Sequence, residues 1–262
     1  MIELERVTRE FATPDGSTYC TLRDVSLTVA AGSFVAIVGP SGCGKSTLLN
    51  IVAGLLPPTG GRVRVDGQAL TGLNRHATYM FQQDALLPWK NVRDNVALGL
   101  TLAGAARADA HARADRWLAR VGLQPFASHY PSQLSGGMRK RVTMAQNWII
   151  DRDIVLMDEP FSALDIHTRQ RMETELLSLW DTSGVKRTIV FVTHDLEEAI
   201  ALADEVVVLS AGPASQIVAR HRVTLERPRD LLELRTSPAF VDLYRSIWAI
   251  LRDEVIKSQV RA

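Results

Sequence analysis

One glycine-rich loop constrains this chain more than any other feature of its sequence. The loop follows the pattern G-x-x-x-x-G-K-[ST], which is typical of a phosphate-binding turn. Its residues are Gly39, Pro40, Ser41, Gly42, Cys43, Gly44, Lys45, Ser46 and Thr47. Residues 34–38 before it are all apolar, as in a buried strand, and residues 46–53 after it are expected to form a helix that ends at Gly54. Strand, loop and helix in this order predict that the chain binds a nucleoside triphosphate.

The expected chemistry of the loop follows from its backbone and two side chains. Glycines let backbone N–H groups turn toward an anion, and the following helix directs its free N–H groups and positive dipole end to the same phosphates. We expect Lys45 to reach the β- and γ-phosphates and the Ser46 hydroxyl to bind Mg²⁺. Alkylation of Cys43 is expected to inhibit, with nucleotide protecting the thiol. A turn without function is disfavoured, because a buried strand directly precedes the loop.

Length and charge exclude several classes of protein. A chain of 262 residues suits one large α/β domain with an inserted subdomain. The formal net charge of +1 gives no strong attraction to nucleic acid or to an anionic membrane, so no nucleic acid partner is expected. The N-terminus does not resemble a secretory signal, and no apolar stretch approaches the ~18–20 residues that span a bilayer. We expect a cytoplasmic protein that reaches a membrane only through a partner.

The distribution of apolar residues predicts how the chain is organised. Alternation in residues 1–33, interrupted by a turn at 14–16, favours antiparallel strands. Residues 86–150 are rich in Ala, Arg and Leu and favour an inserted helical segment, with a helix near 106–121. Strands at 154–157, 188–192 and 205–209 then alternate with helices at 168–179 and 196–202, which indicates a parallel sheet covered by helices. We expect one domain over 1–225 and a helical tail over 226–262.

Two acids follow the apolar strand predicted at residues 154–157. In doubly wound sheets, ligands bind outside the carboxyl ends of the strands, so Asp158 and Glu159 should lie beside the phosphate loop. Asp158 is suited to hold Mg²⁺, most simply through water. Glu159 is suited to orient or deprotonate an attacking water. An ordinary strand end would give the same local pattern, but the phosphate loop upstream favours the functional interpretation.

Four further motifs occur in an order that resembles the ABC-type ATPases. Residues 134–138, Leu-Ser-Gly-Gly-Met, are similar to the signature loop of that family, and residues 162–165, Ser-Ala-Leu-Asp, are similar to its D-loop. Gln82 resembles the Q-loop glutamine and His194 the switch histidine. The resemblance covers residues 2–220 and implies ATP and Mg²⁺ as cofactors. It implies an α/β fold of the P-loop NTPase type, with a mostly parallel core sheet, an N-terminal antiparallel β subdomain and an inserted α-helical subdomain.

The resemblance also implies a division of labour between two copies of the chain. Ser135, Gly136 and Gly137 of one copy would close on the γ-phosphate held by the other, at a helix N-terminus suited to an anion. His194 would hydrogen-bond the γ-phosphate and hold Glu159 and the water in place. Gln82 would contact Mg²⁺ or the water. The implied catalytic residues are Lys45, Gln82, Glu159 and His194, and the implied metal ligands are Ser46, Gln82 and Asp158.

The adenine ring requires an aromatic face, and two residues are candidates. Phe11 occupies the position at which the family places a stacking aromatic, and Tyr19 is the alternative. Residues 86–89, Leu-Leu-Pro-Trp, stand where a membrane subunit docks in this family, and the other interpretation of Trp89 is a core tryptophan in a hydrophobic turn. Together with Ser-Gly-Gly-Met and Asp-Glu-Pro-Phe, this segment resembles the branch that serves nitrate, sulfonate and taurine importers.

The sequence therefore favours the ATP-hydrolysing subunit of an importer of a small anionic solute. The resemblance implies a homodimer at the cytoplasmic face of the membrane, beneath integral permease subunits that receive solute from a separate binding protein. A soluble ABC-type ATPase without a transport role is the alternative, although a single nucleotide domain with no basic patch argues against one that acts on nucleic acid. Trp148 departs from the family pattern without explanation, and the tail could pack on the core or assist dimerisation.

Overall fold

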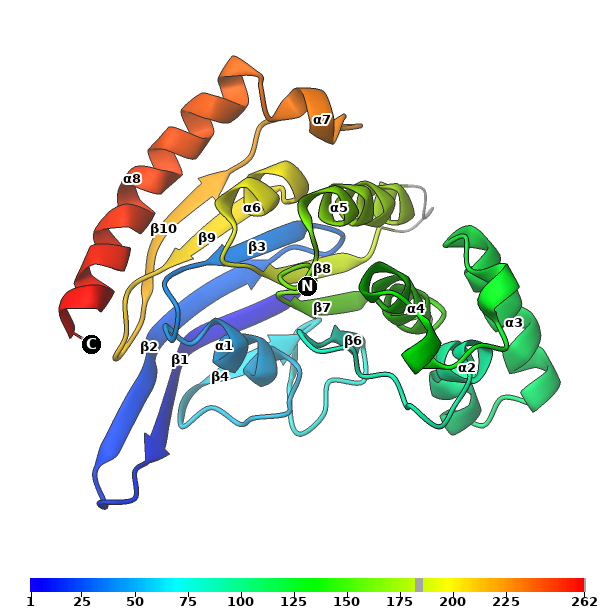
Figure 1. The fold of residues 1–262 in the computed structure, drawn as a ribbon. Coiled ribbons are helices and arrows are strands. Elements are labelled where there is room, and N and C mark those ends of the chain that lie inside the picture. Colours follow the sequence, from blue (N-terminus) through cyan, green and yellow to red (C-terminus); the bar gives the residue numbers. More distant parts are fainter. Residues whose placement is uncertain (182–185, 262) are drawn as a thin grey trace.

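A six-stranded sheet forms the centre of the computed structural model, which describes residues 1–181 and 186–261 (Figure 1). The strand order is β10-β9-β3-β8-β7-β6, and all neighbours are parallel except the β9–β10 pair. The strands are β3 (Phe34–Val38), β6 (Ala77–Met80), β7 (Ile154–Asp158), β8 (Thr188–Val192), β9 (Glu205–Leu209) and β10 (Ile217–Arg222). The mostly parallel core sheet expected from the sequence is confirmed.

The central strands are apolar because both faces of the sheet are covered. Phe34, Ala36 and Val38 of β3 pack with one buried cluster, which includes residues of α5 (Ile166–Asp181) and α6 (Leu196–Leu202). Val35 and Ile37, which alternate with them, pack with a second cluster that includes α1 (Lys45–Val52). Successive strand residues point to opposite faces, so a strand buried on both sides needs a continuous apolar run.

The N-terminal region forms a second, antiparallel sheet. Its order is β2-β1-β4-β5, and its strands are β1 (Ile2–Ala12), β2 (Thr18–Val29), β4 (Gly60–Val65) and β5 (Gln68–Ala69). The β1–β2 hairpin turns at residues 13–17, as the sequence predicted. Ile2, Leu4 and Leu27 pack in the same buried cluster as α1, which places this sheet over one face of the core sheet. The antiparallel β subdomain is confirmed.

Three α-helices lie between β6 and β7 and form a lobe at one side of the molecule (Figure 1). They are α2 (Val92–Leu102), α3 (Arg107–Arg120) and α4 (Gly136–Trp148), and they share a buried cluster of their own. Trp148, at the end of α4, belongs instead to the core cluster together with Met144. This tryptophan therefore joins the helical lobe to the central sheet, which explains a large residue at that position.

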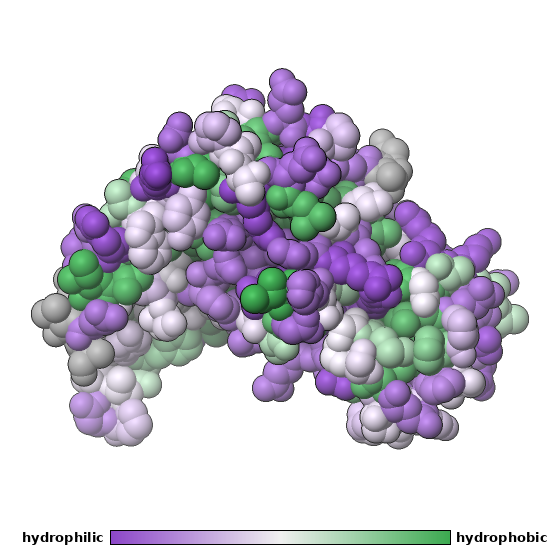
Figure 2. All heavy atoms as spheres, turned by 45° about the horizontal axis from the view of Figure 1, so that its top comes forward, coloured by the Kyte–Doolittle hydropathy of each residue, from purple (hydrophilic) through white to green (hydrophobic). Residues whose placement is uncertain are grey.

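The C-terminal tail packs on the core of the same chain. It comprises α7 (Leu231–Leu234) and α8 (Pro238–Arg261), and Phe240, Ile247 and Leu251 of α8 are buried in the core cluster. Glu254 accepts a hydrogen bond of 2.8 Å from the backbone N–H of Ala211. Within the described parts of the chain, no helix is both long and apolar enough to cross a membrane. On the face shown in Figure 2, the surface is hollowed between the β hairpin at the lower left and the helical lobe at the lower right.

Candidate functional site

The glycine-rich loop connects β3 to α1, as predicted. Gly42 and Gly44 have left-handed backbone angles, with φ of 75° and 92°. A Cβ atom on Gly44 would also lie 2.9 Å from side-chain atoms of Thr21 and Leu22, so glycine is required there for two reasons. Turns with such glycines present successive N–H groups to one concavity, which suits an anion.

Lys45 is the first residue of α1 and lies almost completely inside the loop. Its side-chain ammonium donates hydrogen bonds to the carbonyl oxygens of Gly39 at 2.9 Å and Pro40 at 3.0 Å. The residue is only 6% exposed. The loop itself therefore holds the positive charge at the place where the sequence predicts phosphate binding.

Cys43 is oriented differently from the sequence expectation. The residue is completely buried and packs in the cluster formed by α1 and the antiparallel sheet. Burial raises the pKa of its thiol, and the thiolate is the form that reacts with alkylating reagents. Both features favour slow alkylation of the folded protein, and the expected inhibition stays a prediction.

Ser46 and Asp158 meet where α1 begins and β7 ends. The Ser46 hydroxyl donates a hydrogen bond of 2.9 Å to Asp158 Oδ1, and the Tyr79 hydroxyl donates one of 3.2 Å to Asp158 Oδ2. Burial raises the pKa of Asp158, while these two hydrogen bonds act in the opposite direction. A hydroxyl and a carboxylate at this separation fit Mg²⁺, which prefers oxygen ligands and retains several waters. The sequence did not identify Tyr79, which precedes Gln82 by three residues and lies on the edge strand β6.

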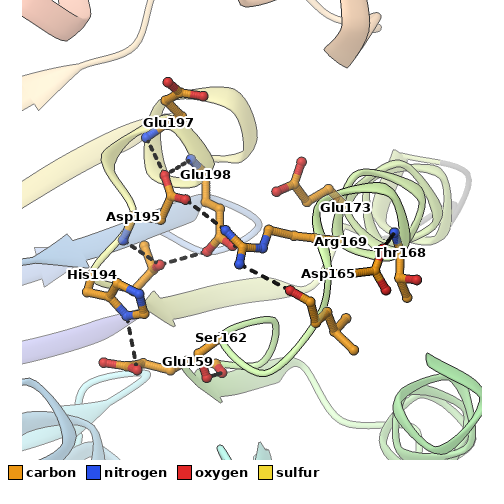
Figure 3. Close-up of polar contacts among 12 residues, drawn as sticks. Glu159, Ser162, Asp165, Thr168, Arg169, Glu173, His194, Asp195, Glu197 and Glu198 are labelled. Carbon is orange, nitrogen blue, oxygen red and sulfur yellow. Dashed lines mark hydrogen bonds and ion pairs between the residues drawn. The ribbon is translucent and has the colours of Figure 1, made fainter. Parts of the chain in front are cut away.

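Glu159 is the point at which three predicted catalytic residues converge. Its Oε2 atom lies 3.3 Å from Gln82 Nε2 and 3.1 Å from His194 Nδ1. The side chains of Glu159 and His194 are 20% and 55% exposed, so both remain accessible to a ligand. Figure 3 shows His194 directed at Glu159 from the loop that follows β8.

The signature-like segment lies at the N-terminus of α4, in the helical lobe. Ser135 caps this helix, with its Oγ atom accepting a hydrogen bond of 3.3 Å from Met138 N, and Gly136 and Gly137 begin it. The phosphate loop lies elsewhere, between β3 and α1 (Figure 1). The structure therefore presents two separate helix N-termini that are suited to anions.

The two adenine candidates lie opposite each other on the β1–β2 hairpin. Phe11 pairs with Tyr19, and directly opposite residues of antiparallel strands place their side chains on the same face. They are 36% and 43% exposed, and the guanidinium carbon of Arg9 lies 4.5 Å from the centre of the Phe11 ring. Phe11 and Tyr19 therefore both stay candidates for the residue that stacks on adenine.

The tryptophan of segment 86–89 is not a core residue. Trp89 is 71% exposed, whereas Leu86 is buried. Asn95 holds the intervening turn: its Oδ1 atom accepts a hydrogen bond of 2.7 Å from Leu87 N, and its Nδ2 atom donates one of 3.1 Å to Leu87 O. A rigid turn thus presents an exposed indole at the surface.

Comparisons with known proteins identify the family. The family model described as ABC transporter matches residues 22–162. The taurine import ATP-binding protein TauB of Rhizobium johnstonii is 44% identical over 255 residues, covering 96% of this chain and 96% of the relative. The nitrate import ATP-binding protein NrtC of Synechococcus elongatus is 38% identical over 255 residues, covering 97% of this chain and 38% of that protein. The chain therefore belongs to the ABC transporter family, as its motifs indicated.

Solved structures support the same conclusion. A dimeric structure of MJ0796, a bacterial ABC transporter cassette, has a TM-score of 0.75 at 32% identity and covers 86% of this chain and 100% of that chain. A dimeric post-hydrolysis state of the same cassette, bound to ADP and Pi, also has a TM-score of 0.75, at 31% identity. The protein has the P-loop NTPase fold and is an ATPase of this family.

Proposed function

We propose that the chain is the ATP-hydrolysing subunit of an importer, and that it works at the cytoplasmic face of the membrane. One observation carries the proposal: Gln82 and His194 converge on Glu159, beside the Ser46–Asp158 pair and the phosphate loop. Within this family, such an arrangement supports hydrolysis of the γ-phosphate bond. The relatives named as taurine and nitrate import proteins support a transport role for the reaction.

The proposed roles of the side chains follow from their positions. Lys45 binds the β- and γ-phosphates, and Glu159 orients or deprotonates the attacking water while His194 and Gln82 keep its carboxylate in place. Mg²⁺, held by Ser46, Asp158 and Gln82, would neutralise charge on the phosphates. Loss of the ammonium in Lys45→Ala removes a charge-assisted contact, so ATP affinity should fall by about 10-fold or more in a fluorescence titration. Unchanged affinity would contradict the assignment of the loop.

A second copy of the chain is the proposed partner at the nucleotide. Ser135, Gly136 and Gly137 begin a helix that lies away from the phosphate loop of the same chain, so their N–H groups suit the γ-phosphate of another copy. The dimeric structures of the related cassette support this pairing. Removal of the γ-phosphate would then weaken the contact between the two copies.

The proposed docking surface for a membrane subunit combines Trp89 with a groove of the helical lobe. The groove has a volume of about 370 Å³ and lies between β6, α2 and α4. Leu102 and Phe81 line it and are 80% and 42% exposed. Thr78 lines it too, and its hydroxyl has no hydrogen-bond partner among residues 1–181 and 186–261. Apolar side chains line the groove together with polar ones such as Gln146 and Arg152, and this mixture suits a short amphipathic helix of a permease.

The proposed solute is a small anion of the nitrate, sulfonate or taurine class, delivered to the permease by a separate binding protein. The test is co-purification of the chain with membrane subunits, followed by ATPase assays in vesicles with each anion and its binding protein. We expect one class of anion to stimulate hydrolysis several-fold. Stable ATPase activity without any membrane partner, in cells that contain the candidate permeases, would favour the soluble ATPase instead.

A further inference from the structure

The first turn of α5 connects the loops on either side of the γ-phosphate region. Arg169, in this turn, donates a hydrogen bond of 3.1 Å from Nη1 to Asp195 Oδ2 (Figure 3). It donates a second, of 3.2 Å, from Nη2 to the carbonyl oxygen of Leu164. Asp195 directly follows His194, and Leu164 lies in the D-loop-like segment 162–165. One guanidinium group therefore ties the two segments together.

In the loop that carries His194, the residues on either side of the histidine are fixed by hydrogen bonds. Asp195 Oδ1 accepts hydrogen bonds from the N–H groups of Glu197 at 2.9 Å and Glu198 at 3.2 Å, which caps α6. The Thr193 hydroxyl accepts a bond of 3.0 Å from Asp195 N and donates one of 2.7 Å to Glu198 Oε2. The imidazole of His194 is the part of this loop that remains free to face Glu159.

Arg169 also contacts the buried end of the same network. Its Nε atom lies 3.6 Å from Glu198 Oε1, and the Glu198 side chain is only 4% exposed. One planar guanidinium group thus joins three partners: it donates hydrogen bonds to the histidine loop and the D-loop-like segment, and it forms an ion pair with Glu198 on α6. A lysine could not reproduce this arrangement, because it offers a single charged centre on a flexible stem.

The helix turn that carries Arg169 is itself fixed from the signature side. Thr168 N donates a hydrogen bond of 3.0 Å to Asp165 Oδ1. A Cβ atom on Gly137 would lie 2.7 Å from Thr168 Cγ2, so the signature-like segment packs closely against this turn. Arg169 is therefore mounted on a rigid element.

We propose that Arg169 is a positioning residue for ATP hydrolysis, which keeps His194 aligned on Glu159 by tying the histidine loop to the D-loop-like segment. The proposal rests on the proposed function, since it assumes that His194 and Glu159 act on the γ-phosphate. Arg169 itself contacts neither of these side chains; it acts through Asp195 and the loop backbone. Loss of its fork would let the imidazole move, and a displacement of about 1 Å at such a site can cost ~10²-fold in rate.

The test compares Arg169→Met with Arg171→Met on the same helix. The Arg171 side chain is 69% exposed and pairs only with Glu175 among the described ion pairs, so its removal controls for loss of charge. We expect Arg169→Met to lower kcat by about 10–100-fold with ATP affinity within about two-fold, and Arg171→Met to change neither. Arg169→Lys should recover only part of the rate. Equal kcat values for the Arg169→Met and Arg171→Met variants would overturn the proposal.

A double-mutant cycle with His194→Ala separates positioning from a general structural role. If Arg169 acts through His194, the double variant should be no slower than His194→Ala alone, because the second change removes nothing that remains. Rate losses that multiply would overturn the proposal. Arg169→Met also leaves the buried carboxylate of Glu198 without its cation. The double variant Arg169→Met/Glu198→Gln repeats the kcat measurement without that buried charge. Wild-type kcat in this double variant would also overturn the positioning proposal.

The dimer assay keeps this proposal distinct from the proposed function. Glu159→Gln with saturating ATP should form a dimer, and failure to do so would count against the ATP sandwich, whatever Arg169 does. Arg169→Met introduced into Glu159→Gln should leave this ATP-bound dimer intact, because the proposal concerns the alignment of His194. Loss of the dimer in that variant would overturn the positioning role.

Discussion

Glu159 is held in a backbone conformation that few residues other than glycine adopt. Its φ is 44°, in the left-handed region, which costs about 1–3 kcal/mol for such a residue. Its backbone N–H donates a hydrogen bond of 2.9 Å to Val192 O, and its carbonyl oxygen accepts one of 3.0 Å from the Ser162 hydroxyl. These two contacts maintain the conformation, and the strained backbone aims the carboxylate at His194 and Gln82.

The first prediction at the scale of single residues concerns the carboxylate of Glu159. Glu159→Gln keeps the shape of the side chain but cannot take a proton from water, so ATP should still bind while turnover falls by at least about 10²–10³-fold. The variant should elute as an ATP-dependent dimer in size-exclusion chromatography with light scattering. A monomer at saturating ATP, or wild-type turnover, would contradict the proposed roles.

Glu198 gives a prediction on pH. Burial raises its pKa to about 7 from an ordinary value near 4.5, although the hydrogen bond from Thr193 acts in the opposite direction. Between pH 4.5 and 7, the Glu198 carboxyl loses its proton in the unfolded state and keeps it in the folded state. The stabilising contribution of this protonation to the free energy of unfolding is therefore complete below pH 4.5 and is lost as the pH rises to 7. The loss should be on the order of 3 kcal/mol.

The measurement is urea unfolding of the wild type and of Glu198→Gln across this pH range. Because glutamine does not titrate, the difference in unfolding free energy between the two proteins should change with pH in the direction given. A difference that is constant from pH 4.5 to 7 would show that Glu198 titrates normally.

At the scale of elements, the C-terminal tail is fastened to α5 by a buried ion pair. Arg235, just after α7, lies 2.6 Å from Glu173 Oε2, measured from its Nη2 atom, and the Glu173 side chain is completely buried. Burial raises the pKa of Glu173, and Arg235 acts against this shift. A buried carboxylate that loses its cation destabilises the folded state, so this ion pair should contribute more to the free energy of unfolding than the exposed pairs of α8.

Arg235→Met should therefore lower the free energy of unfolding by about 3–5 kcal/mol. The double variant Arg235→Met/Glu173→Gln should lose much less unfolding free energy, because no unpaired buried charge remains. Arg252→Met on α8 is the matched control: the Arg252 side chain is 60% exposed and faces only Asp253 among the described pairs, so its removal should cost less than about 1 kcal/mol. Denaturant unfolding measures all three, and equal stabilities for the Arg235 and Arg252 variants would refute the prediction.

At the scale of the whole molecule, the two lobes divide the proposed tasks. The core and the antiparallel sheet hold the phosphate loop and the residues around Glu159, while the helical lobe carries the signature-like segment and the proposed docking surface. Lys140 of α4 links the two, since its Nζ atom donates a hydrogen bond of 2.9 Å to Gln82 O and lies 3.1 Å from Asp84 Oδ1. A partner bound at the lobe could thus influence the position of Gln82.

Trp89→Ala tests this division. Removing an exposed aromatic anchor should weaken binding of the membrane subunits by about 2 kcal/mol, or roughly 30-fold, with ATPase activity of the isolated chain unchanged. Trp248→Ala on α8, where the indole is 41% exposed, serves as the control and should leave binding unaltered. The measurement is retention of the permease during purification together with solute uptake. Normal uptake by the Trp89 variant would refute the docking surface.

Much of the site could be predicted because its parts are local. The phosphate loop has a fixed spacing, and Asp158 and Glu159 directly follow an apolar strand, so a parallel sheet places them at the same edge. The edge strand β10 was not predicted. Its residues are only partly buried or exposed, and the sequence Arg220, His221 and Arg222 is typical of a solvent-exposed segment. Edge strands give a weak pattern because one side of their backbone lacks a neighbouring strand.

The amino-acid sequence by itself determined the fold class, the alternation of strands and helices in the core and the phosphate-binding chemistry, because each depends on short-range periodicity or on a contiguous motif. Only the tertiary structure decided which way a given side chain faces and what lies against it. In the folded chain the Cys43 thiol is buried and the Trp89 indole is exposed. Tyr79 donates a hydrogen bond to Asp158, and Arg169 connects two loops. The physical reason is that these contacts join residues from different segments, so their geometry depends on how the whole core packs.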